Sequence, residues 1–492
     1  MRSSSAVLMT RVLEGDLQVY LVERNPKLRF FGGYWAFPGG VLDAVDQLAE
    51  EVGDDHALER CALRELFEET GILCGALGLV VPESKRATLR ESLVDLKTDA
   101  SDWAPYAAAA DEARSCLSHV TTISTPEFSP VRHVTPFFQV EIPTGQSPLI
   151  VPGELVQGRF WNLEQLVDDW RAGKISVAPP VLFLLDLMRG HSLEEFMRLA
   201  REHGERMAAG QLHQVYFTPG VMIAPLATPT LPPATTTNCV LVGEDRIYIV
   251  DPATPEARDR ERLFETLDRW VAGGRTLAGI LLTHHHMDHV GAVEVTAERY
   301  GLDLFAHPET LSLLNFPGVK SHPIEHGHQF DLGTAPDGSQ GWTLEAFHTP
   351  GHAPGHLVFI ESLHRAAIVG DLVSTLSTIV IDPPEGHMAT YLASIQSILD
   401  QKISVLLPAH GAGARIGSDV LRYHLRRRAE REAKIVIALE RAPGTLEELL
   451  PIVYDDAPAE VMPFAARSLL AGLQKLGEEQ RATETDARWS LR

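Results

Sequence analysis

The sequence predicts an α/β protein built from several domains. Its 492 residues exceed what one hydrophobic core usually holds, and 45% are apolar against 22% charged, as in ordinary globular proteins. Short apolar runs bounded by turn residues alternate with helical patterns over most of the chain. Near the C-terminus the pattern becomes mainly helical. We therefore expect three domains, at residues 1–215, 216–420 and 421–492.

Charge and cysteine usage narrow the range of partners. The formal net charge of −23 argues against non-specific binding of nucleic acid by the whole molecule, although residues 421–492 are neutral overall. No apolar run reaches the roughly 18 residues that a membrane span needs. The N-terminus lacks an apolar signal core, and the four cysteines show no paired spacing. We therefore expect a cytoplasmic protein without membrane association, disulfides or a thiolate zinc site.

The densest cluster of candidate metal ligands is Thr-His-His-His-Met-Asp-His at residues 283–289, directly after an apolar run typical of a buried strand. Because residues two apart in extended backbone point to the same side, His284 and His286 can bind one cation together. Asp288 and His289 follow where the chain turns and can face a second cation. Imidazole and carboxylate ligands suit zinc or a similar divalent metal. The alternative is a run of solvated loop histidines.

Three further strand ends favour the metal site. His352, Asp371 and His410 each follow an apolar run, in Thr-Pro-Gly-His, Ile-Val-Gly-Asp and Leu-Pro-Ala-His. Together with the histidine cluster, and in this order, these segments resemble the metallo-β-lactamase superfamily over roughly residues 225 to 420. The resemblance implies an αββα sandwich, with the site at one edge where the loops that follow the strands converge.

The resemblance also assigns ligands. The matching positions are His284, His286 and His352 for a first metal, Asp288, His289 and His410 for a second, and Asp371 between the two. Two Zn²⁺ ions, or Mn²⁺ or Fe²⁺, would lower the pKa of a bridging water and polarise a carbonyl or phosphoryl oxygen. Asp288 is also expected among the catalytic residues. Asp251 ends an earlier strand and is expected to order the site from behind the ligands. His285, His348 and His356 lie beside ligands but do not match them.

The N-terminal part carries a second acidic cluster on a predicted helix. Glu65, Glu68 and Glu69 are spaced i, i+3 and i+4, so their carboxylates share one helical face. Like charges placed this way repel one another unless a cation lies among them. Oxygen ligands around a diphosphate suit Mg²⁺ or Mn²⁺. A solvated acidic face is the alternative, but the preceding glycines and Arg64 favour a metal site.

This segment resembles the Nudix box, a glycine-led loop followed by a helix with the pattern R-E-x-x-E-E-x-G. The pattern is matched at Arg64, Glu65, Glu68, Glu69 and Gly71. Residues 41–63 are a longer connection than the usual spacing, as in Nudix hydrolases that act on coenzyme A derivatives. The acidic position expected before the helix therefore falls on Asp46 when counted from Gly40, or on His56 when counted back from the helix.

A second part of the resemblance concerns the substrate. Residues 21–24, Arg29, Gly33 and 37–40 keep the spacing of the coenzyme A diphosphatase signature, with Asn25 where a small residue is usual. The implied roles are metal binding by Glu68 and Glu69, metal binding or general-base catalysis by Glu65, orientation of these glutamates by Arg64, and substrate binding by Arg24, Arg29, Gly39 and Gly40. Glu154, just before a later strand, is a weaker candidate for another carboxylate.

The segments between these motifs complete the two larger domains. We expect a hairpin near residues 5–24, a polar helical region over 82–125, and a strand at 134–142, followed by helices that close the first domain. Residues 208–235 are rich in proline and threonine and are interpreted as the crossing between domains.

The C-terminal segment resembles a winged-helix module. A long helix from residue 421 to 439 carries a basic cluster, a short helix follows Gly444-Thr445, a third covers residues 458–476, and residues 482–491 can form a hairpin. Such modules bind nucleic acid or pack against their own catalytic domain. Because the module has no net charge and a single basic cluster, packing is the favoured interpretation.

The leading functional hypothesis is a bifunctional metal-dependent hydrolase. A Nudix half would cleave a diphosphate of a nucleotide or coenzyme A derivative, and a metallo-β-lactamase-fold half would cleave an ester or thioester. Only 39 positions separate Asp371 from His410, which leaves no room for the domain inserted in RNA-processing nucleases of the superfamily. The alternative is a single-strand endoribonuclease or phosphodiesterase, with the Nudix half as a ligand sensor. The oligomeric state is left open.

Overall fold

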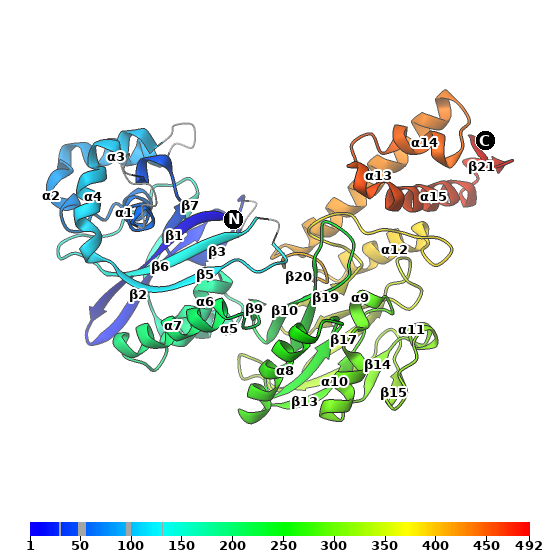
Figure 1. Cartoon of the computed structure of the whole chain (residues 1–492), viewed down its shortest axis with the longest axis horizontal. Coiled ribbons are helices and arrows are strands. Elements are labelled where there is room, and N and C mark those ends of the chain that lie inside the picture. The colour runs from blue at the N-terminus through cyan, green and yellow to red at the C-terminus, as the bar shows by residue number, and fades with distance from the viewer. Residues whose placement is uncertain (29–30, 48–55, 95–99, 130) are drawn as a thin grey trace. The chain divides into compact units, whose positions relative to one another are not determined.

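The computed structural model describes residues 1–28, 31–47, 56–94, 100–129 and 131–492. Within the described residues, the chain divides into two compact units, Met1–Gln211 and Leu212–Arg492 (Figure 1). None of the described helices is long and apolar enough to cross a membrane.

The first unit is built on one mixed sheet of eight strands. Its main path is β5-β6-β1-β2-β3-β8, with β4 paired to β1 and β7 paired to β2. The predicted hairpin forms, because β1 and β2 pair antiparallel around a turn at residues 14–15. The strands are β1 (Arg2–Leu13), β2 (Asp16–Arg24), β3 (Tyr34–Ala36), β4 (Gly39–Val41), β5 (Ser118–Ser124), β6 (His133–Glu141), β7 (Leu155–Asn162) and β8 (Ser176–Val177).

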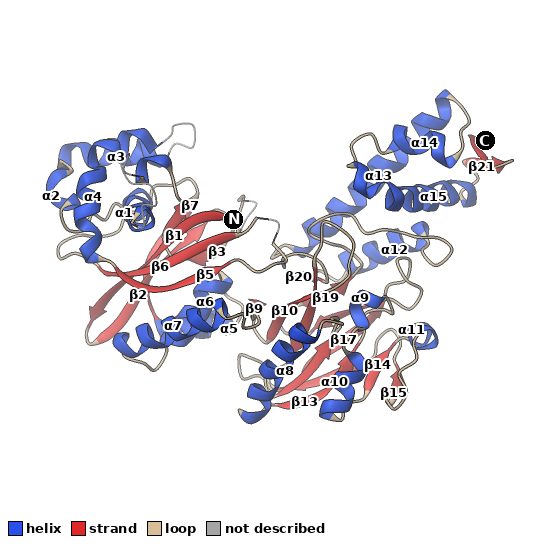
Figure 2. Cartoon of the chain, viewed as in Figure 1, coloured by secondary structure: helices blue, strands red, loops and turns tan. Residues whose placement is uncertain are grey.

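Helices lie on both sides of this sheet (Figure 2). One side carries η1 (Ala44–Asp46), α1 (Ala57–Thr70), α2 (Leu77–Val80), α3 (Glu83–Val94), η2 (Ala100–Tyr106), α4 (Ala107–Ala113) and η3 (Arg114–Cys116), and the other carries α5 (Leu163–Arg171), α6 (Pro179–Met188) and α7 (Leu193–Ala208). The helix predicted around Arg64 is α1, which ends at Gly71 in the left-handed conformation that glycine tolerates.

The helical interpretation of residues 82–125 is wrong at its C-terminal end. Residues Ser118–Ser124 form β5, which pairs antiparallel with β6. The segment is rich in β-branched residues, and Val120 and Thr121 are buried. Its burial beside β6 therefore favours a strand over a continued helix.

The second unit contains two sheets packed between helices. Helices α8 (Ala257–Ala272) and α10 (Val293–Tyr300) contact the seven-stranded sheet, while α12 (Met388–Leu399) and α13 (Gly417–Arg441) pack on the five-stranded sheet. This is the expected αββα arrangement. The first sheet runs β15 (Ser321–Pro323), β14 (Leu304–Ala306), β13 (Thr276–Leu281), β12 (Arg246–Val250), β11 (Thr236–Val242), β10 (Val221–Ala227) and β9 (Val215–Thr218). The second runs β16 (Gln329–Gly333), β17 (Trp342–His348), β18 (Leu357–Glu361), β19 (Ala366–Gly370) and β20 (Val405–Pro408).

The interpretation of residues 208–235 as a simple crossing is wrong in part, because β9 and β10 lie within it. Strand β10 is buried along almost its whole length and pairs antiparallel with β11. Its Pro225 pairs with β11 but lies beyond the residues that pair with β9, so its missing N–H leaves no broken ladder there. The apolar content of the strand outweighs the turn signals around it.

The C-terminal part of the second unit consists of α13, α14 (Leu446–Val453), η4 (Ala459–Val461), α15 (Met462–Glu478) and the hairpin β21 (Ala482–Thr485) with β22 (Arg488–Leu491). Thr445 caps α14 and exchanges hydrogen bonds with Glu448 in a capping box. Apolar side chains of all three helices and of the hairpin form one core. This is the predicted arrangement of helices followed by a hairpin wing.

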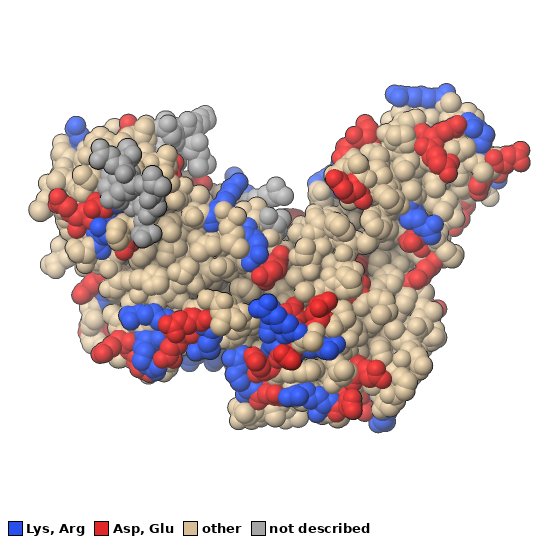
Figure 3. All heavy atoms as spheres, in the orientation of Figure 1, with Lys and Arg blue, Asp and Glu red and all other residues tan. Residues whose placement is uncertain are grey.

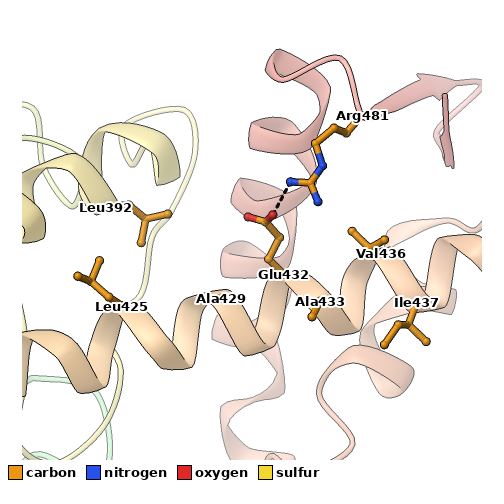
Figure 4. Close-up of a pocket in the computed structure, with 8 residues that line it drawn as sticks. All are labelled: Leu392, Leu425, Ala429, Glu432, Ala433, Val436, Ile437 and Arg481. Carbon is orange, nitrogen blue, oxygen red and sulfur yellow. Dashed lines mark hydrogen bonds and ion pairs between the residues drawn. The ribbon is translucent and has the colours of Figure 1, made fainter.

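A cavity of about 440 Å³ lies along α13 (Figure 4). Leu392 of α12 and Leu425 of α13 line one part of it, and Val436 lines another. An ion pair between Glu432 and Arg481 lies beside it.

Candidate functional site

The predicted ligands of the second unit come together at the carboxyl ends of strands. Residues 284–289 follow β13, His352 follows β17, Asp371 follows β19 and His410 follows β20. In each sheet the two strands that lead to central residues of the site run parallel, β12 with β13 and β19 with β20. Their carboxyl ends therefore meet at one edge, as the sequence analysis expected.

Three histidines form the first trio: His284, His286 and His352. The Nδ1 atom of His286 lies 3.0 Å from the Nε2 atom of His284 and 3.0 Å from the Nε2 atom of His352. His284 is fully buried. Three imidazole nitrogens this close to one another fit a site for one divalent metal.

Asp288, His289 and His410 form the second trio, in which the Asp288 carboxylate lies 3.5 Å from His410 Nε2 and 4.0 Å from His289 Nε2. Asp371 lies between the two trios. Its Oδ2 atom is 3.5 Å from His352 Nε2, and its Oδ1 atom is 3.3 Å from His410 Nε2. One carboxylate oxygen therefore faces each trio.

The outer nitrogens of the histidine rings have partners that turn the inner nitrogens toward the site. These partners are Thr283 Oγ1 for His284 at 3.0 Å, Asp251 for His289 at 2.8 Å, the Val380 carbonyl for His352 at 2.9 Å and the Thr236 carbonyl for His410 at 3.0 Å. An Nδ1–H that donates to an oxygen leaves the Nε2 lone pair for a metal.

Asp251 has the position behind the ligands that the sequence predicted. Its carboxylate accepts hydrogen bonds from the Thr283 backbone N–H and hydroxyl as well as facing His289. The residue is buried and adopts a positive φ of 50°, which aspartate tolerates better than most side chains. Asp251 therefore ties the end of β12 to the first residues after β13.

The buried charges of the site fit a cation. His289 Nε2 and Asp371 Oδ1 are buried without a hydrogen-bond partner among the described residues. Burial lowers the pKa of His289, but the carboxylates of Asp251 and Asp288 outweigh it and raise the pKa to about 9. Burial raises the pKa of Asp371, yet His410 and neighbouring imidazoles hold it well below its usual value. The Asp371 carboxylate thus meets inward-facing imidazole nitrogens, a set of donors that fits a divalent metal site.

Two residues beside the ligands were not assigned a role from the sequence. His356 is buried, and its Nε2 atom accepts a hydrogen bond from the Asp371 backbone N–H at 3.1 Å, so it holds the Asp371 backbone. Glu385 was missed. Its carboxylate lies 3.1 Å from His285 Nε2 and 3.3 Å from His286 Nε2. No motif marks Glu385, because it lies in an irregular segment between β19 and α12.

In the first unit, Arg64 is the central residue of the Nudix-like site. Its guanidinium contacts both oxygens of Asp46 at 2.9 Å, Glu65 at 3.0 Å and Glu68 at 3.2 Å. Arg64 and Asp46 are both buried. This bidentate pair identifies Asp46 as the acidic residue that precedes the helix, while His56 is exposed and pairs with Glu59.

The two box glycines lie against the glutamates. The Gly39 backbone N–H donates to Glu69 Oε2 at 2.9 Å. A Cβ atom on Gly40 would lie 2.4 Å from Glu65 Oε1, and one on Gly39 would lie 2.2 Å from the Ser5 carbonyl. Glycine therefore lets the loop approach β1 closely at Gly39 and the Glu65 side chain of α1 closely at Gly40.

The three glutamates of α1 are crowded and desolvated. Burial followed by repulsion from Glu65 raises the pKa of Glu68 to about 8 and that of Glu69 well above its usual value. Burial also raises the pKa of Glu65. Among the described residues, however, the groups whose ligand atoms lie within 4.8 Å of one another all belong to the second unit. The three glutamates are therefore neighbours, but their carboxylate oxygens lie farther apart than the ligand atoms within each of the two trios.

The remaining candidates of the first unit are placed as follows. Arg24 ends β2, and its charge offsets a small part of the rise in the pKa of Glu69. Glu154 raises the pKa of Glu65 and Glu68. The Asn25 side chain donates to the Gly153 carbonyl at 2.8 Å and so holds the loop that carries Glu154. Arg29 lies outside the described residues.

Comparison with known proteins agrees with this geometry. The model of the metallo-beta-lactamase superfamily matches residues 232–410. An atrochrysone carboxyl ACP thioesterase of Passalora fulva is 31% identical over 264 residues, which cover 50% of this chain and 74% of that protein. The chain belongs to the metallo-β-lactamase superfamily. A thioesterase of the same name from Claviceps purpurea is 30% identical and covers 50% of this chain and 78% of its own length.

Two further family models match in the predicted order. The NUDIX domain model matches residues 2–179, and the beta-lactamase associated winged helix domain model matches residues 445–489. The crystal structure of a beta-lactamase domain protein from Burkholderia ambifaria has the same fold, with a TM-score of 0.50 and 19% identity over 57% of this chain and 93% of that one. Both enzyme families depend on metals, so this member is a metal-dependent hydrolase that joins both domains in one chain.

The first prediction concerns Asp251. Asp251→Asn keeps the side-chain shape and the tolerance of positive φ but removes the charge that faces His289. We expect zinc affinity at the second trio to fall about 10- to 100-fold, as for other groups that orient metal-binding histidines. Competition with a chromophoric chelator measures this change. Asp303→Asn, which alters an exposed pair with Lys320, is the control and should leave zinc affinity unchanged.

The second prediction concerns the glutamates of α1. The pKa of Glu68 rises from 4.5 to about 8 on folding, so the folded unit binds more protons than the unfolded chain between these values. Without metal, the contribution of Glu68 to stability should therefore be greatest below about pH 4.5 and decrease as the pH rises toward 8. Mg²⁺ competes with those protons, so it should raise the unfolding temperature more at about pH 8 than at about pH 5. Thermal unfolding with and without Mg²⁺ measures the difference.

Glu68→Gln should flatten this dependence on pH and reduce the effect of Mg²⁺. Glu91→Gln, on the exposed face of α3, is the matched control and should behave like the unchanged protein. An equal effect of Mg²⁺ at both pH values would contradict the assignment of a cation to these glutamates.

Proposed function

We propose that this chain is a bifunctional hydrolase with two independent metal sites. The metallo-β-lactamase-fold unit would cleave an ester or thioester, and the Nudix unit would cleave a diphosphate of a nucleotide or coenzyme A derivative. The observation that carries the proposal is the placement of Asp371, with one oxygen toward each trio of ligands. Such a carboxylate is suited to hold two cations beside one substrate.

At the metal site of the metallo-β-lactamase-fold unit, the chain supplies the ligands and a proton acceptor. The first trio would hold one metal and the second trio the other, two Zn²⁺ or alternatively Mn²⁺ or Fe²⁺, with Asp371 shared. When bound, two such cations lower the pKa of a water between them and polarise the substrate carbonyl. Asp288 keeps part of its carboxylate exposed beside His410, which suits it to accept the proton of the attacking water and pass it to the leaving group.

Two findings support an ester or thioester as the bond cleaved. Relatives at 31% and 30% identity are named as thioesterases of acyl carrier protein. The short connection from Asp371 to His410 consists of α12, β20 and irregular segments that pack on the unit itself, so it holds no inserted domain for a nucleic-acid substrate. A small acyl thioester is therefore our preferred substrate class.

In the Nudix unit, Glu65, Glu68 and Glu69 would bind Mg²⁺ or Mn²⁺ on a diphosphate, and Glu65 would serve as ligand or general base. Arg64 holds Glu65 and Glu68 while its own position is set by Asp46. The raised pKa values of these glutamates favour proton release when a cation binds. Arg24 is suited to pair with a substrate phosphate.

The alternative of a nuclease presented with RNA by the C-terminal module has less support. The basic cluster of α13 is largely neutralised within the module, because Arg427 pairs with Glu430 at 2.8 Å and Arg431 pairs with Asp456 at 2.8 Å. Basic and acidic side chains lie interspersed over this module on the face drawn in Figure 3. A surface with this pairing offers few free cations to a phosphate backbone.

The third prediction tests both activities together. The purified protein is incubated with coenzyme A, acyl-coenzyme A, nucleoside diphosphate derivatives and short RNA, and the products are identified by mass spectrometry. We expect products of diphosphate cleavage and products of thioester cleavage. Glu69→Gln should reduce only the cleavage of diphosphates, and His286→Ala only the cleavage of thioesters. Each rate should fall about 100-fold or more, because a metal ligand is lost. The matched controls are Glu91→Gln and His191→Ala, both at exposed positions and neither part of the two clusters.

Thioester cleavage that survives in His286→Ala would refute the first assignment, and diphosphate cleavage that survives in Glu69→Gln would refute the second. Turnover of RNA with no thioester product would favour the nuclease alternative. Silence from the Nudix unit would make it a ligand sensor.

A further inference from the structure

The segment at residues 379–387 carries two groups that orient the first trio. The Val380 carbonyl accepts a hydrogen bond from His352 Nδ1 at 2.9 Å, which leaves Nε2 of that ring directed at the site. The Glu385 carboxylate lies 3.3 Å from His286 Nε2, which leaves Nδ1 of that ring directed at the site. These are the two nitrogens that meet at 3.0 Å in the first trio. Two of the three rings of the trio therefore depend on this one segment for their orientation.

The segment forms neither helix nor strand between β19 and α12. One turn is closed by its own hydrogen bond, from the Gly386 N–H to the Asp382 carbonyl at 2.7 Å, and its remaining backbone hydrogen bonds among the described residues go to partners outside the segment. The C-terminal module supplies several of these partners. Arg428 of α13 donates to the Ile379 carbonyl. The Ile381 backbone N–H donates to Ser468 Oγ of α15 at 3.2 Å.

Further along, α15 holds the turn that presents Glu385. Arg467 forms an ion pair with Asp382 and donates to the Pro383 carbonyl at 3.0 Å. His387, at the end of the segment, contacts Glu478 at 3.0 Å. The backbone groups that face the module and those that face the histidines alternate along residues 379–381, as expected for extended chain.

Burial distinguishes two of these contacts from ordinary surface pairs. Arg428 is only 8% exposed and Ser468 only 7% exposed. A buried guanidinium is costly unless it is hydrogen-bonded, and Arg428 directs its group to the backbone of the segment. It also lies over the ring of Tyr391, 5.2 Å from the centroid.

Tyr391 in turn packs against the loop that carries His352. A Cβ atom on Gly351 would lie 2.3 Å from the Tyr391 backbone nitrogen, so the backbone at Gly351 and the backbone at Tyr391 are in close contact. Arg428 is therefore connected to His352 indirectly in two ways. It contacts the segment that accepts the His352 hydrogen bond, and it contacts Tyr391, which packs against the loop of His352.

We propose that the C-terminal module acts as a brace for the metal centre, with Arg428 and Ser468 as positioning residues that hold residues 379–387 against the first trio. The role of the winged-helix fold in this chain is then internal: it maintains the orientation of His286 and His352. The proposal rests on the metal-ligand set proposed above, and the experiment separates the two.

The experiment measures zinc affinity of the full-length protein by chelator competition and the visible spectrum of the Co²⁺-loaded protein, which reports ligand geometry. Ser468→Ala and Arg428→Met should each weaken zinc binding about 10-fold, as for other groups that orient metal-binding histidines, and should shift the Co²⁺ bands. Arg428→Lys should recover part of the affinity, because it restores a donor for the Ile379 carbonyl. Arg427→Met, one position earlier on α13, is the matched control and should change neither readout, because in the part of the chain that the structure describes its ion pairs are with Glu430 and Asp456.

Wild-type affinity and spectrum in both Ser468→Ala and Arg428→Met, while His286→Ala loses zinc, would overturn the brace and leave the ligand set intact. Unchanged zinc binding in His286→Ala would overturn the ligand set and the brace with it. Circular dichroism checks the fold of each variant. Should loss of the buried arginine unfold the module, Ser468→Ala decides the question, because it exchanges one hydroxyl for hydrogen and leaves the apolar contacts in place.

Discussion

A buried carboxylate between two groups of imidazoles is the constraint on which the second unit depends. Asp371 presents one oxygen to each trio, and burying it next to inward-facing nitrogens is favourable only when the opposing charges are matched. The surrounding structure is arranged to keep those groups apart from other partners. Outer contacts from Asp251 and the Val380 and Thr236 carbonyls occupy the far nitrogens, so that the near ones remain for a metal.

The Nudix unit also buries carboxylates close together, but its candidate ligands are oxygen atoms alone. Its glutamates share one face of α1, and burial raises their pKa values, so without metal they tend to hold protons. Arg64 offsets part of the repulsion, and Asp46 keeps Arg64 in place from the opposite side. The first unit thus places a guanidinium of the chain itself, that of Arg64, among its carboxylates, whereas the candidate ligands of the second unit are imidazoles and carboxylates alone.

The C-terminal module directs its polar contacts inward as well as outward. Arg427 and Arg431 pair with acidic residues of the same module, while the buried Arg428 reaches the backbone beside the metal centre. Arginines of one helix therefore make two kinds of contact: Arg427 and Arg431 form ion pairs within the module, and Arg428 hydrogen-bonds the backbone of residues 379–387. This division explains why a basic cluster in the sequence need not form a surface for nucleic acid.

The sequence alone determined the order of the domains and the ligand types, because strand-end histidines and an i, i+3, i+4 set of glutamates are local patterns with a direct chemical meaning. It also indicated the hairpin wing and the placement of Asp251. It left open whether Asp46 or His56 pairs with Arg64, because an insertion made the two counts disagree, and only the folded loop brought Asp46 to the guanidinium. The strands β5 and β10 were missed because their state depends on the neighbours that bury them. Glu385 and the contacts of Arg428 were likewise decided by tertiary structure, since residues far apart in the chain meet there and no local pattern encodes that meeting.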